Sequence, residues 1–370
     1  MTRAQDQQDQ FFMRRALLLA KKGAGKTSPN PIVGAVIVRH GKVVGEGYHH
    51  RAGSAHAEII ALDQAGEKAI GGTLYTNLEP CCHTQKRTPP CTNALLKSGI
   101  ARVVAGMVDP NRMVNGKGFE TLRTAGISVS IGLLRHEAMR LNEVFVKQIT
   151  TQLPFVILKA AMTMDGRIAT KACESRWITG EKARKEVHKL RSCVDAVLVG
   201  IGTVLADDPM LTTHRKKDRN PLRVVIDPDL KTPMTARLIT SVSSAPTLIL
   251  THVSTASKKA AAFIRAGVQI ESFPPKKDGI PFQAILKKLA NLGMTSLLIE
   301  GGGKVNGRAL REGVVDKVIF FIAPKFLCGN DAKAVVDGKA IASLAHAISL
   351  HGIKIKKMGN DICVEGYIKS

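Results

Sequence analysis

Two short stretches, His56-Ala57-Glu58 and Leu78-Glu79-Pro80-Cys81, together with Cys91, determine how we interpret this chain. An apolar run over residues 59–62 predicts a helix that begins near the histidine. The run at residues 73–78 predicts a strand with the Pro-Cys pair at its carboxyl end. A histidine, a glutamate two residues later and a proline-preceded cysteine with a later partner form the pattern of a site where zinc activates water.

The chemistry of such a site assigns roles to these residue types. A catalytic zinc takes three protein ligands and keeps one open position, and we predict His56, Cys81 and Cys91 as the ligands. Glu58 is not a ligand in this interpretation and moves protons between water and the leaving group. The alternative is a structural histidine among buried free cysteines. An isolated His-x-Glu pattern would be weak evidence, but its combination with the cysteines favours the metal site.

Composition and charge limit the possible classes of protein. The chain has 370 residues, enough for two domains, and is 44% hydrophobic and 23% charged, as soluble globular proteins are. Aromatic residues make up 4%, which disfavours a base-stacking surface. The net charge of +24 is spread along the chain. A solvated basic surface or an anionic small substrate explains this charge better than RNA binding.

The cysteines and apolar runs indicate the compartment. Seven cysteines, an odd number in a large chain, disfavour a secreted disulfide framework. The first residues contain no apolar signal segment, and no apolar run is long enough to span a membrane. We therefore expect a cytoplasmic protein.

Alternating strand and helix patterns predict two α/β domains, residues 1–150 and 154–370, separated by Gln152-Leu153-Pro154. In the first domain we expect a helix at 10–22, a helix at 92–98, and strands at 32–38, 42–48, 73–78 and 102–107. In the second we expect helices at 180–192, 282–291 and 305–312, and strands at 155–160, 196–200, 223–226, 247–250 and 296–299. The segments 317–322 and 353–368 are predicted as strand pairs at one end of a sheet.

The first half resembles the bifunctional deaminase/reductase family of riboflavin biosynthesis. The resemblance rests on residues 28–34, on Gly47-Tyr48-His49, on the zinc motif and on Thr88-Pro89-Pro90-Cys91. It implies a cytidine-deaminase-like, three-layer domain that removes an amino group from a diaminopyrimidinone carrying a phosphoribosylamino group. It also implies that Asn30 and His49 line the substrate pocket and that Arg87 contacts the substrate phosphate.

The spacing of the cysteines departs from this family. Nine residues separate Cys81 from Cys91 where the family leads us to expect eight, so Cys82 is a second candidate ligand. We choose Cys81, because the preceding strand fixes its position and an extra residue is better accommodated in the loop that follows. Cys82 is then a small side chain beside the site.

The second half extends the resemblance, which covers essentially the whole chain. Its motifs are residues 159–167, 174–179, 202–209 and 300–303. They imply a dihydrofolate-reductase-like domain that uses NADPH to reduce the ribose of the deaminated product to a ribityl chain. From the residues alone, the glycines at 301–303 predict a tight turn before a helix, where backbone N–H groups bind phosphate or simply connect two elements.

The resemblance also implies roles for individual residues of the second half. Lys159 and Asp165 are placed near the reacting atoms. The implied cofactor-binding residues are Ala161, Trp177, Thr203, Asp207, Gly302, Gly303 and Lys304. The implied substrate-binding residues are Ser175, Arg191, Leu211, His214 and Glu300.

Several of these residues have other interpretations or depart from the family. Trp177 could fill a core, Asp207 could cap a helix, and Lys159 could extend to solvent. His214 stands where the family leads us to expect an arginine, and Ala161 stands in place of a glycine.

We therefore predict a two-domain enzyme with Zn2+ and NADPH as cofactors. Its expected partner is a small phosphorylated pyrimidine, and we expect a homo-oligomer without nucleic acid or membrane. The rival interpretation is a tRNA-editing or other RNA-binding protein of the deaminase fold, which the charge and the His-x-Glu pattern would also suit.

Overall fold

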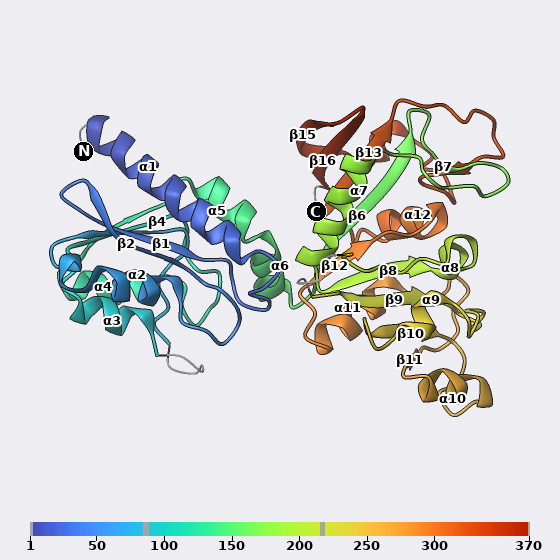
Figure 1. Cartoon of the computed structure of the whole chain (residues 1–370), viewed down its shortest axis with the longest axis horizontal. Helices are drawn as coiled ribbons and strands as arrows, with labels where there is room; N and C mark the ends of the chain where they lie inside the picture. Colours follow the sequence, from blue (N-terminus) through green and yellow to red (C-terminus); the bar gives the residue numbers. More distant parts are fainter. Residues whose placement is uncertain (1–2, 84–88, 215–218, 369–370) are drawn as a thin grey trace. The chain divides into compact units, whose positions relative to one another are not determined.

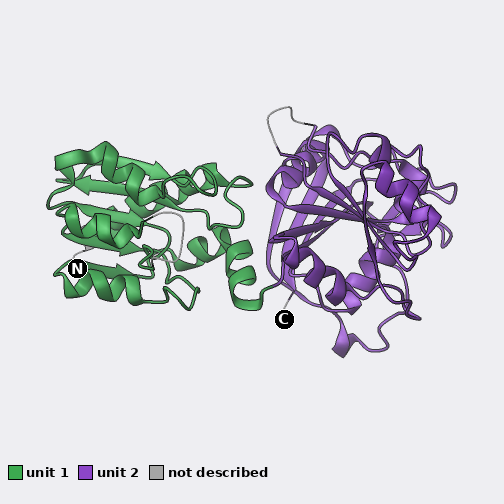
Figure 2. Ribbon diagram, turned by 90° about the horizontal axis from the view of Figure 1, so that it is seen from below, with its two compact units in different colours: residues 1–152 green, residues 153–370 purple. Residues whose placement is uncertain are grey.

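The computed structural model describes residues 3–83, 89–214 and 219–368. The chain divides into two compact units, Met1–Gln152 and Leu153–Ser370, which Figure 2 shows in different colours. We call them the first and the second unit. The division falls within the segment 152–154 that the sequence suggests as a linker.

The first unit contains a five-stranded sheet in the order β2-β1-β3-β4-β5. The strands are β1 (Gly34–Arg39), β2 (Lys42–Tyr48), β3 (Thr73–Thr76), β4 (Arg102–Ala105) and β5 (Ser128–Ile131). Strand β1 is antiparallel to β2 and β3, whereas β3, β4 and β5 are parallel. Parallel pairing places the carboxyl ends of β3 and β4 at one edge of the sheet, where Leu78-Glu79-Pro80-Cys81 follows β3.

Helices cover both faces of this sheet, which gives the three layers that the sequence predicts. Figure 1 shows α1 and α5 on one face and α2, α3 and α4 on the other. The helices are α1 (Arg3–Ala20), α2 (Ala57–Ala65), α3 (Cys91–Lys97), α4 (Lys117–Thr124), α5 (Arg135–Leu141) and α6 (Glu143–Thr151).

Helix α1 corrects the prediction of a helix at 10–22, because it begins at Arg3 and ends at Ala20. The sequence before residue 10 is polar and has no apolar period. This part of α1 contacts the sheet through Asp9 instead. Asp9 is buried and accepts hydrogen bonds from Arg102 (2.6 Å) and from the hydroxyl of Tyr75 (2.7 Å). A charged pair thus anchors the helix where apolar residues are missing.

The second unit contains a nine-stranded sheet in the order β11-β10-β9-β8-β12-β6-β13-β16-β15. All neighbouring strands from β11 at one edge through β13 are parallel to one another. Strands β16 and β15 complete the other edge as an antiparallel pair. The prediction of paired strands at one end of the sheet is confirmed. The strands are β6 (Phe155–Thr163), β8 (Ala196–Gly200), β9 (Leu222–Ile226), β10 (Thr247–Thr251), β11 (Gln269–Ser272), β12 (Ser296–Ile299), β13 (Lys317–Ala323), β15 (Leu350–Met358) and β16 (Asp361–Ile368).

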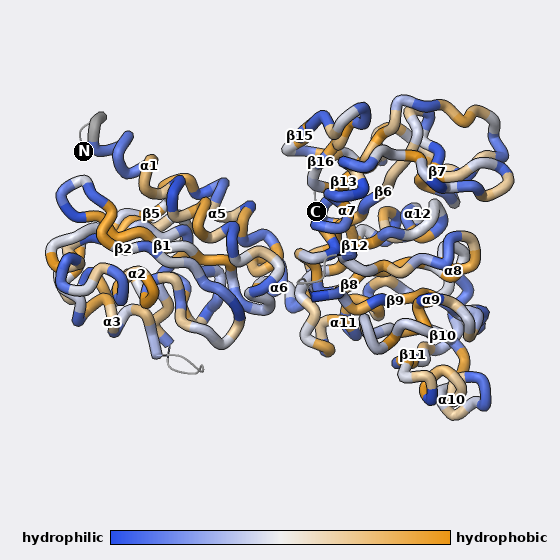
Figure 3. The backbone as a smooth tube through the Cα atoms, in the orientation of Figure 1, coloured by the Kyte–Doolittle hydropathy of each residue, from blue (hydrophilic) through white to orange (hydrophobic). Residues whose placement is uncertain are grey.

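Strands β8, β9 and β10 are buried along their whole length, as strands of a parallel sheet covered on both faces are. Hydrophobic residues concentrate along the strands of both units in Figure 3. The helices are α7 (Glu181–Cys193), α8 (Ile201–Asp207), α9 (Arg237–Thr240), α10 (Lys258–Arg265), α11 (Phe282–Asn291) and α12 (Gly303–Arg311), and a two-stranded ribbon joins β7 (Arg167–Ala169) to β14 (Lys333–Ala334). None of the helices in the described ranges has the length and apolar character needed to cross a membrane.

The close packing of α2 on β2 supplies a test of the fold. A Cβ atom on Gly45 would lie 2.1 Å from the carbonyl oxygen of Ala61, which is far inside van der Waals contact. We expect Gly45→Ala to push α2 away from the sheet and to lower the free energy of unfolding by about 1–3 kcal/mol. Urea denaturation followed by circular dichroism measures this. Gly202→Ala is the control, since open space surrounds its Cβ position, and an equal effect of both changes would contradict the packing argument.

Candidate active sites

The three predicted zinc ligands meet at one edge of the first unit's sheet. His56 is the residue before α2, Cys81 follows β3, and Cys91 is the first residue of α3. Their ligand atoms all lie within 4.8 Å of one another. His56 Nδ1 lies 3.2 Å from Cys91 Sγ and 3.5 Å from Cys81 Sγ. Residues separated by 35 positions in the sequence thus form one cluster.

This donor set fits a zinc ion in both chemistry and spacing. One imidazole and two thiols are ligands that zinc prefers, and three protein ligands leave a position open. Zinc–ligand bonds of about 2.0–2.3 Å in a tetrahedron separate neighbouring ligand atoms by about 3.5 Å, close to the distances observed. The backbone N–H of Cys91 also donates to Cys81 Sγ (3.3 Å), which helps to fix the position of this sulfur.

A cavity of about 600 Å³ lies beside the cluster, and residues of the first unit alone line it. Glu58 is 3% exposed and lines this cavity with His56 and Cys81. Asn30 and His49 also line it, with Asn30 Nδ2 3.1 Å from His49 Nε2 and the other ring nitrogen of His49 3.1 Å from the carbonyl of Ala55. The cavity therefore holds a buried carboxylate, a metal-ligand cluster and two groups able to recognise a polar substrate.

Glu79 fixes the loop that carries Cys81. Its buried carboxylate accepts four backbone N–H groups, those of Asp109 (3.1 Å), Gly116 (2.9 Å), Gly118 (2.9 Å) and Phe119 (3.4 Å). The last two belong to the first turn of α4, where the helix dipole also favours a negative charge. The loop before the zinc cluster is thus tied to the segment that follows β4.

Two predictions concern residues around Cys81. The described cluster contains Cys81 and not Cys82, and both side chains are partly buried. Arg87, predicted to contact the substrate phosphate, lies in residues 84–88, outside the described residues.

The second unit contains a cavity of about 610 Å³, within the usual size range of ligand sites. Most of the residues expected there from the sequence line this cavity. They are Lys159, Ala161, Ser175, Trp177, Arg191, Thr203, Asp207, Leu211, His214, Glu300 and Gly302. The structure thus brings together groups from β6, α7, α8 and the end of β12.

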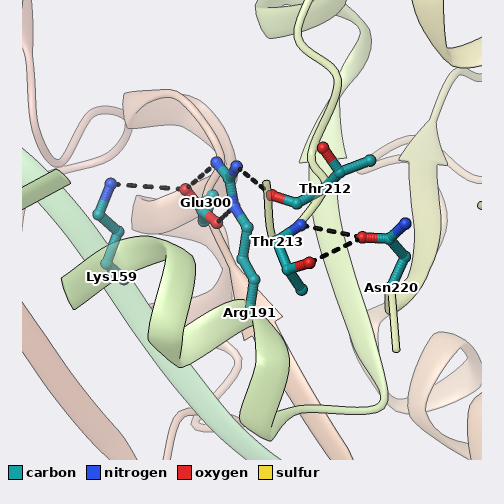
Figure 4. A network of polar contacts seen from close by, with 6 residues as sticks. All are labelled: Lys159, Arg191, Thr212, Thr213, Asn220 and Glu300. Atoms are coloured by element: carbon teal, nitrogen blue, oxygen red, sulfur yellow. Dashed lines mark hydrogen bonds and ion pairs between the residues drawn. The ribbon is translucent and has the colours of Figure 1, made fainter. Parts of the chain in front are cut away.

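Figure 4 shows the charged network of Lys159, Arg191 and Glu300, three residues that line this cavity. Glu300 accepts from Arg191 Nε (2.7 Å) and Nη2 (3.0 Å), and Lys159 Nζ lies 3.4 Å from the same carboxylate. Arg191 also donates to the carbonyl of Thr212 (3.1 Å). Burial opposes ionisation of Glu300, but the two cations outweigh it and lower the pKa of this carboxyl to about 2. Burial lowers the pKa of Lys159, against the attraction of Glu300.

Two further pairs shape the cavity wall. The hydroxyl of Ser175 donates to Asp207 Oδ1 (2.6 Å), so a predicted substrate residue and a predicted cofactor residue are joined directly. Trp177 is 64% exposed, which rules out simple core filling. The guanidinium carbon of Arg184 lies 4.5 Å from the centre of the indole ring, a cation–π contact that holds the indole at the cavity wall.

The three glycines at 301–303, at the turn before α12, are needed for two different reasons. A Cβ on Gly303 would lie 2.3 Å from the carbonyl of Ala334, and one on Gly301 would lie 2.6 Å from Val305. These two glycines are thus required by internal packing. The nearest atom to a Cβ on Gly302 is Thr203 Oγ1 at 3.8 Å, so the backbone is approachable from the cavity there.

Asp165, Gly303 and Lys304 are not among the described residues that line the cavity. Asp165 accepts hydrogen bonds from the hydroxyl of Thr163 (2.5 Å) and from the N–H groups of Leu327 and Cys328 (3.3 and 2.8 Å). These contacts hold the turn after β13. The structure therefore does not bring Asp165 to the network of Lys159 and Glu300.

Sequence patterns missed several residues that line the two cavities. In the first unit these include Asp109, which is buried and follows β4 in an Asp-Pro-Asn sequence typical of a turn. In the second unit they include Arg184, His188 and Arg237. Polar residues in helices usually face solvent, so the residue type alone does not indicate that these three side chains line a cavity. The carboxyl-end position of Asp109 after a strand was the one available clue.

The ligand set predicts different outcomes for the neighbouring cysteines. We expect Cys81→Ala to lose bound zinc, because two remaining ligands hold the metal weakly. The matched variant Cys82→Ala should retain one zinc per chain. Metal analysis after purification and gel filtration measures both. Retention of zinc by the first variant and loss by the second would contradict the assignment.

The buried ion network predicts a large effect of Glu300→Gln on stability. The side chains of Lys159 and Arg191 are 13% exposed, and this change leaves both cations without their carboxylate. We expect the free energy of unfolding to fall by about 3–5 kcal/mol at pH 7, measured by urea denaturation. Since the folded-state pKa of Glu300 is depressed from 4.5 to about 2, the difference from wild type should shrink as the pH falls through this interval.

An exposed ion pair provides the control for this change. Glu181 and Lys185 form an i,i+4 pair with side chains 68% and 73% exposed, and Glu181→Gln should leave the denaturation midpoint unchanged. Equal midpoints for wild type and Glu300→Gln would show that the network does not stabilise the fold.

Comparisons with known proteins identify both units. Residues 6–107 match the cytidine and deoxycytidylate deaminase zinc-binding region, and residues 154–364 match the RibD C-terminal domain. The riboflavin biosynthesis protein RibD of Aquifex aeolicus is 43% identical over 357 residues, covering 96% of this chain and 97% of its own length. That of Escherichia coli K12 is 39% identical over 370 residues, with coverage of 96% and 98%.

Solved structures agree over nearly the full length. Acinetobacter baumannii RibD superposes with a TM-score of 0.87 at 35% identity, covering 99% of this chain and all of that chain. The diaminohydroxyphosphoribosylaminopyrimidine deaminase/5-amino-6-(5-phosphoribosylamino)uracil reductase of Thermotoga maritima gives the same TM-score, identity and coverage. The chain therefore belongs to the RibD family of riboflavin biosynthesis proteins, as a bifunctional enzyme that joins a zinc-dependent deaminase to an NADPH-dependent reductase.

Proposed function

We propose that the first unit removes the amino group of 2,5-diamino-6-(5-phosphoribosylamino)pyrimidin-4(3H)-one and that the second unit reduces the ribosyl group of the product to ribityl phosphate. The observation that carries the proposal is the joint presence of the His56–Cys81–Cys91 cluster and the charged reductase cavity in one chain. The named activities of the Thermotoga maritima relative support this substrate pair.

Deamination needs a nucleophilic water and a proton carrier. Zinc, when bound, supplies the Lewis acid that makes water nucleophilic at neutral pH. Glu58 takes the proton from the attacking water and delivers it to the departing amine, so that water replaces ammonia on the pyrimidine carbon. Asn30 and His49 hold the ring in the cavity. Burial of Glu58 keeps bulk water from competing for these proton transfers.

Reduction needs a hydride donor and a proton donor. When bound, NADPH would supply the hydride for the anomeric carbon. The cavity residues Ala161, Trp177, Thr203, Asp207 and Gly302 would hold it, together with Gly303 and Lys304 in the first turn of α12. The sugar ring oxygen leaves that carbon as a hydroxyl group and takes a proton from Lys159, whose lowered pKa makes the ammonium a better acid.

The other substrate contacts complete this site. Ser175, Arg191, Leu211, His214 and Glu300 bind the substrate, with Glu300 orienting both Lys159 and Arg191.

The surroundings of the enzyme belong to the same proposal. We propose that the enzyme works in a reducing cytoplasm, since the described residues contain no disulfide. Homo-oligomer formation stays a prediction. The rival RNA-editing interpretation is not favoured, because the family match extends through a whole reductase unit that RNA editing does not require.

A coupled assay tests the two activities together. The purified chain receives the diaminopyrimidinone and NADPH, and the oxidation of NADPH is followed by its absorbance. We expect Glu58→Ala to lower deamination by at least about 100-fold, the usual contribution of a positioned acid–base group, while reduction of supplied deaminated intermediate is preserved.

Two controls separate the activities. A zinc chelator should reproduce the effect of Glu58→Ala. Turnover of the diaminopyrimidinone by Glu58→Ala at the wild-type rate would refute the role of Glu58, and failure of the wild-type chain to oxidise NADPH with the intermediate would refute the reductase assignment.

A further inference from the structure

The charges that line the reductase cavity are unbalanced. Two carboxylates, Asp207 and Glu300, face a larger set of cations. Those cations are Lys159, Arg176, Arg184, Arg191 and Arg237. A cavity with this excess attracts anionic ligands, and the partners of each cation show which one has a charge left to bind them.

Four of the cations are already engaged. Lys159 and Arg191 share Glu300. Arg184 stacks on Trp177 and donates to the carbonyl of Thr179 (2.9 Å), and Arg176 donates to the backbone carbonyl of Asp207.

Arg237 differs from these four. Its backbone N–H donates to Asp208 Oδ1 (2.8 Å), but its guanidinium has no hydrogen-bond or ion-pair partner among the described residues. The side chain lines the cavity and is exposed to it. Among the described lining residues, Arg237 is therefore the cation that is free to bind an incoming anion.

The backbone that carries Arg237 is held firmly. Arg223 is fully buried in β9 and donates to Leu238 O (2.9 Å), to Ser241 Oγ (2.8 Å) and to Ala245 O (2.5 Å). Asp208 accepts the backbone N–H of Arg237 at the start of α9. The guanidinium of Arg223 donates to the carbonyls of Leu238 and Ser241. This short helix therefore presents Arg237 from a fixed position, which lowers the entropic cost of binding.

Arg237 lies close enough to His214 for its charge to act on that ring. His214 and His188 pack edge to face with ring centres 4.6 Å apart, and both line the cavity. Burial and the positive charges of Arg191 and Arg237 lower the pKa of His214 below its usual 6.5. At neutral pH this ring is thus an uncharged hydrogen-bonding group, and the permanent charge of this corner comes from Arg237.

We propose that Arg237, with His188 and His214, binds a phosphate monoester in the reductase cavity. A guanidinium matches two phosphate oxygens at once, and imidazoles complete the hydrogen bonds. The inference rests on the proposed function, because both the phosphoribosyl substrate and the 2′-phosphate of NADPH carry this group. It assigns to Arg237 the selection of the phosphorylated ligand, without a part in the chemical step.

Steady-state kinetics of the full chain test this role. The deaminated intermediate and its dephosphorylated form are each reduced with NADPH and with NADH by wild type and by Arg237→Ala. If the substrate phosphate is bound, KM for the phosphorylated substrate should rise about 10- to 100-fold, the loss of one charge-assisted contact, with kcat within about threefold. KM for the dephosphorylated substrate should not change. If the cofactor phosphate is bound, the preference for NADPH over NADH should fall by this factor instead.

A rescue variant separates binding from structure. Position 214 lines the same corner, so His214→Arg in the Arg237→Ala background should restore most of the lost affinity for the phosphorylated ligand. Arg265→Ala, which removes an exposed arginine of α10 away from the cavity, should match wild type in every assay.

Two results decide against the inference. Equal kinetics of wild type and Arg237→Ala with all four ligand pairs would overturn it. An equal loss for phosphorylated and dephosphorylated ligands without rescue would also overturn it, because the loss would then be structural. An inactive wild-type chain would instead show that the proposed reductase function itself is wrong.

Discussion

Parallel strand pairing is the constraint on which both sites depend. In the first unit β3 pairs in parallel with β4, and Cys81 and Asp109 follow their carboxyl ends. In the second unit β12 pairs in parallel with β6 and β8, and Glu300 follows β12 directly. Loops at this edge are free of the hydrogen-bond ladder, so their side chains can converge on a ligand while the sheet keeps their spacing. The same rule thus builds a metal cluster in one unit and an ion network in the other.

Positive charge has different meanings at different places in this protein. The net charge of +24 first suggests a nucleic-acid partner. Inside the second unit, however, part of this charge surrounds a cavity whose carboxylates already serve other groups. That arrangement suits anionic small ligands. The lysines of the exposed edge strand β15 are solvated instead, and charges there also discourage pairing with another sheet.

The sequence predicts this fold well wherever local pattern and tertiary packing agree. Strand β2, strand β12 and helix α11 have the expected bounds, and the zinc ligands His56, Cys81 and Cys91 come together as their spacing suggests. The first turns of α1 could not be found from an apolar period, because a buried Asp9–Arg102 pair replaces it. Arg237 and Asp165 show the same limit at the site. Their positions depend on which partner a charged side chain meets across the fold, and Asp165 meets the turn after β13.

The lining of the two cavities has a consequence for inheritance. Every described residue around the zinc cluster comes from the first unit, and every described residue around the reductase cavity comes from the second. A substitution in the lining of one cavity therefore leaves the described lining of the other unchanged. Selection can accordingly tune the two steps separately, although a single messenger encodes them in equal amounts.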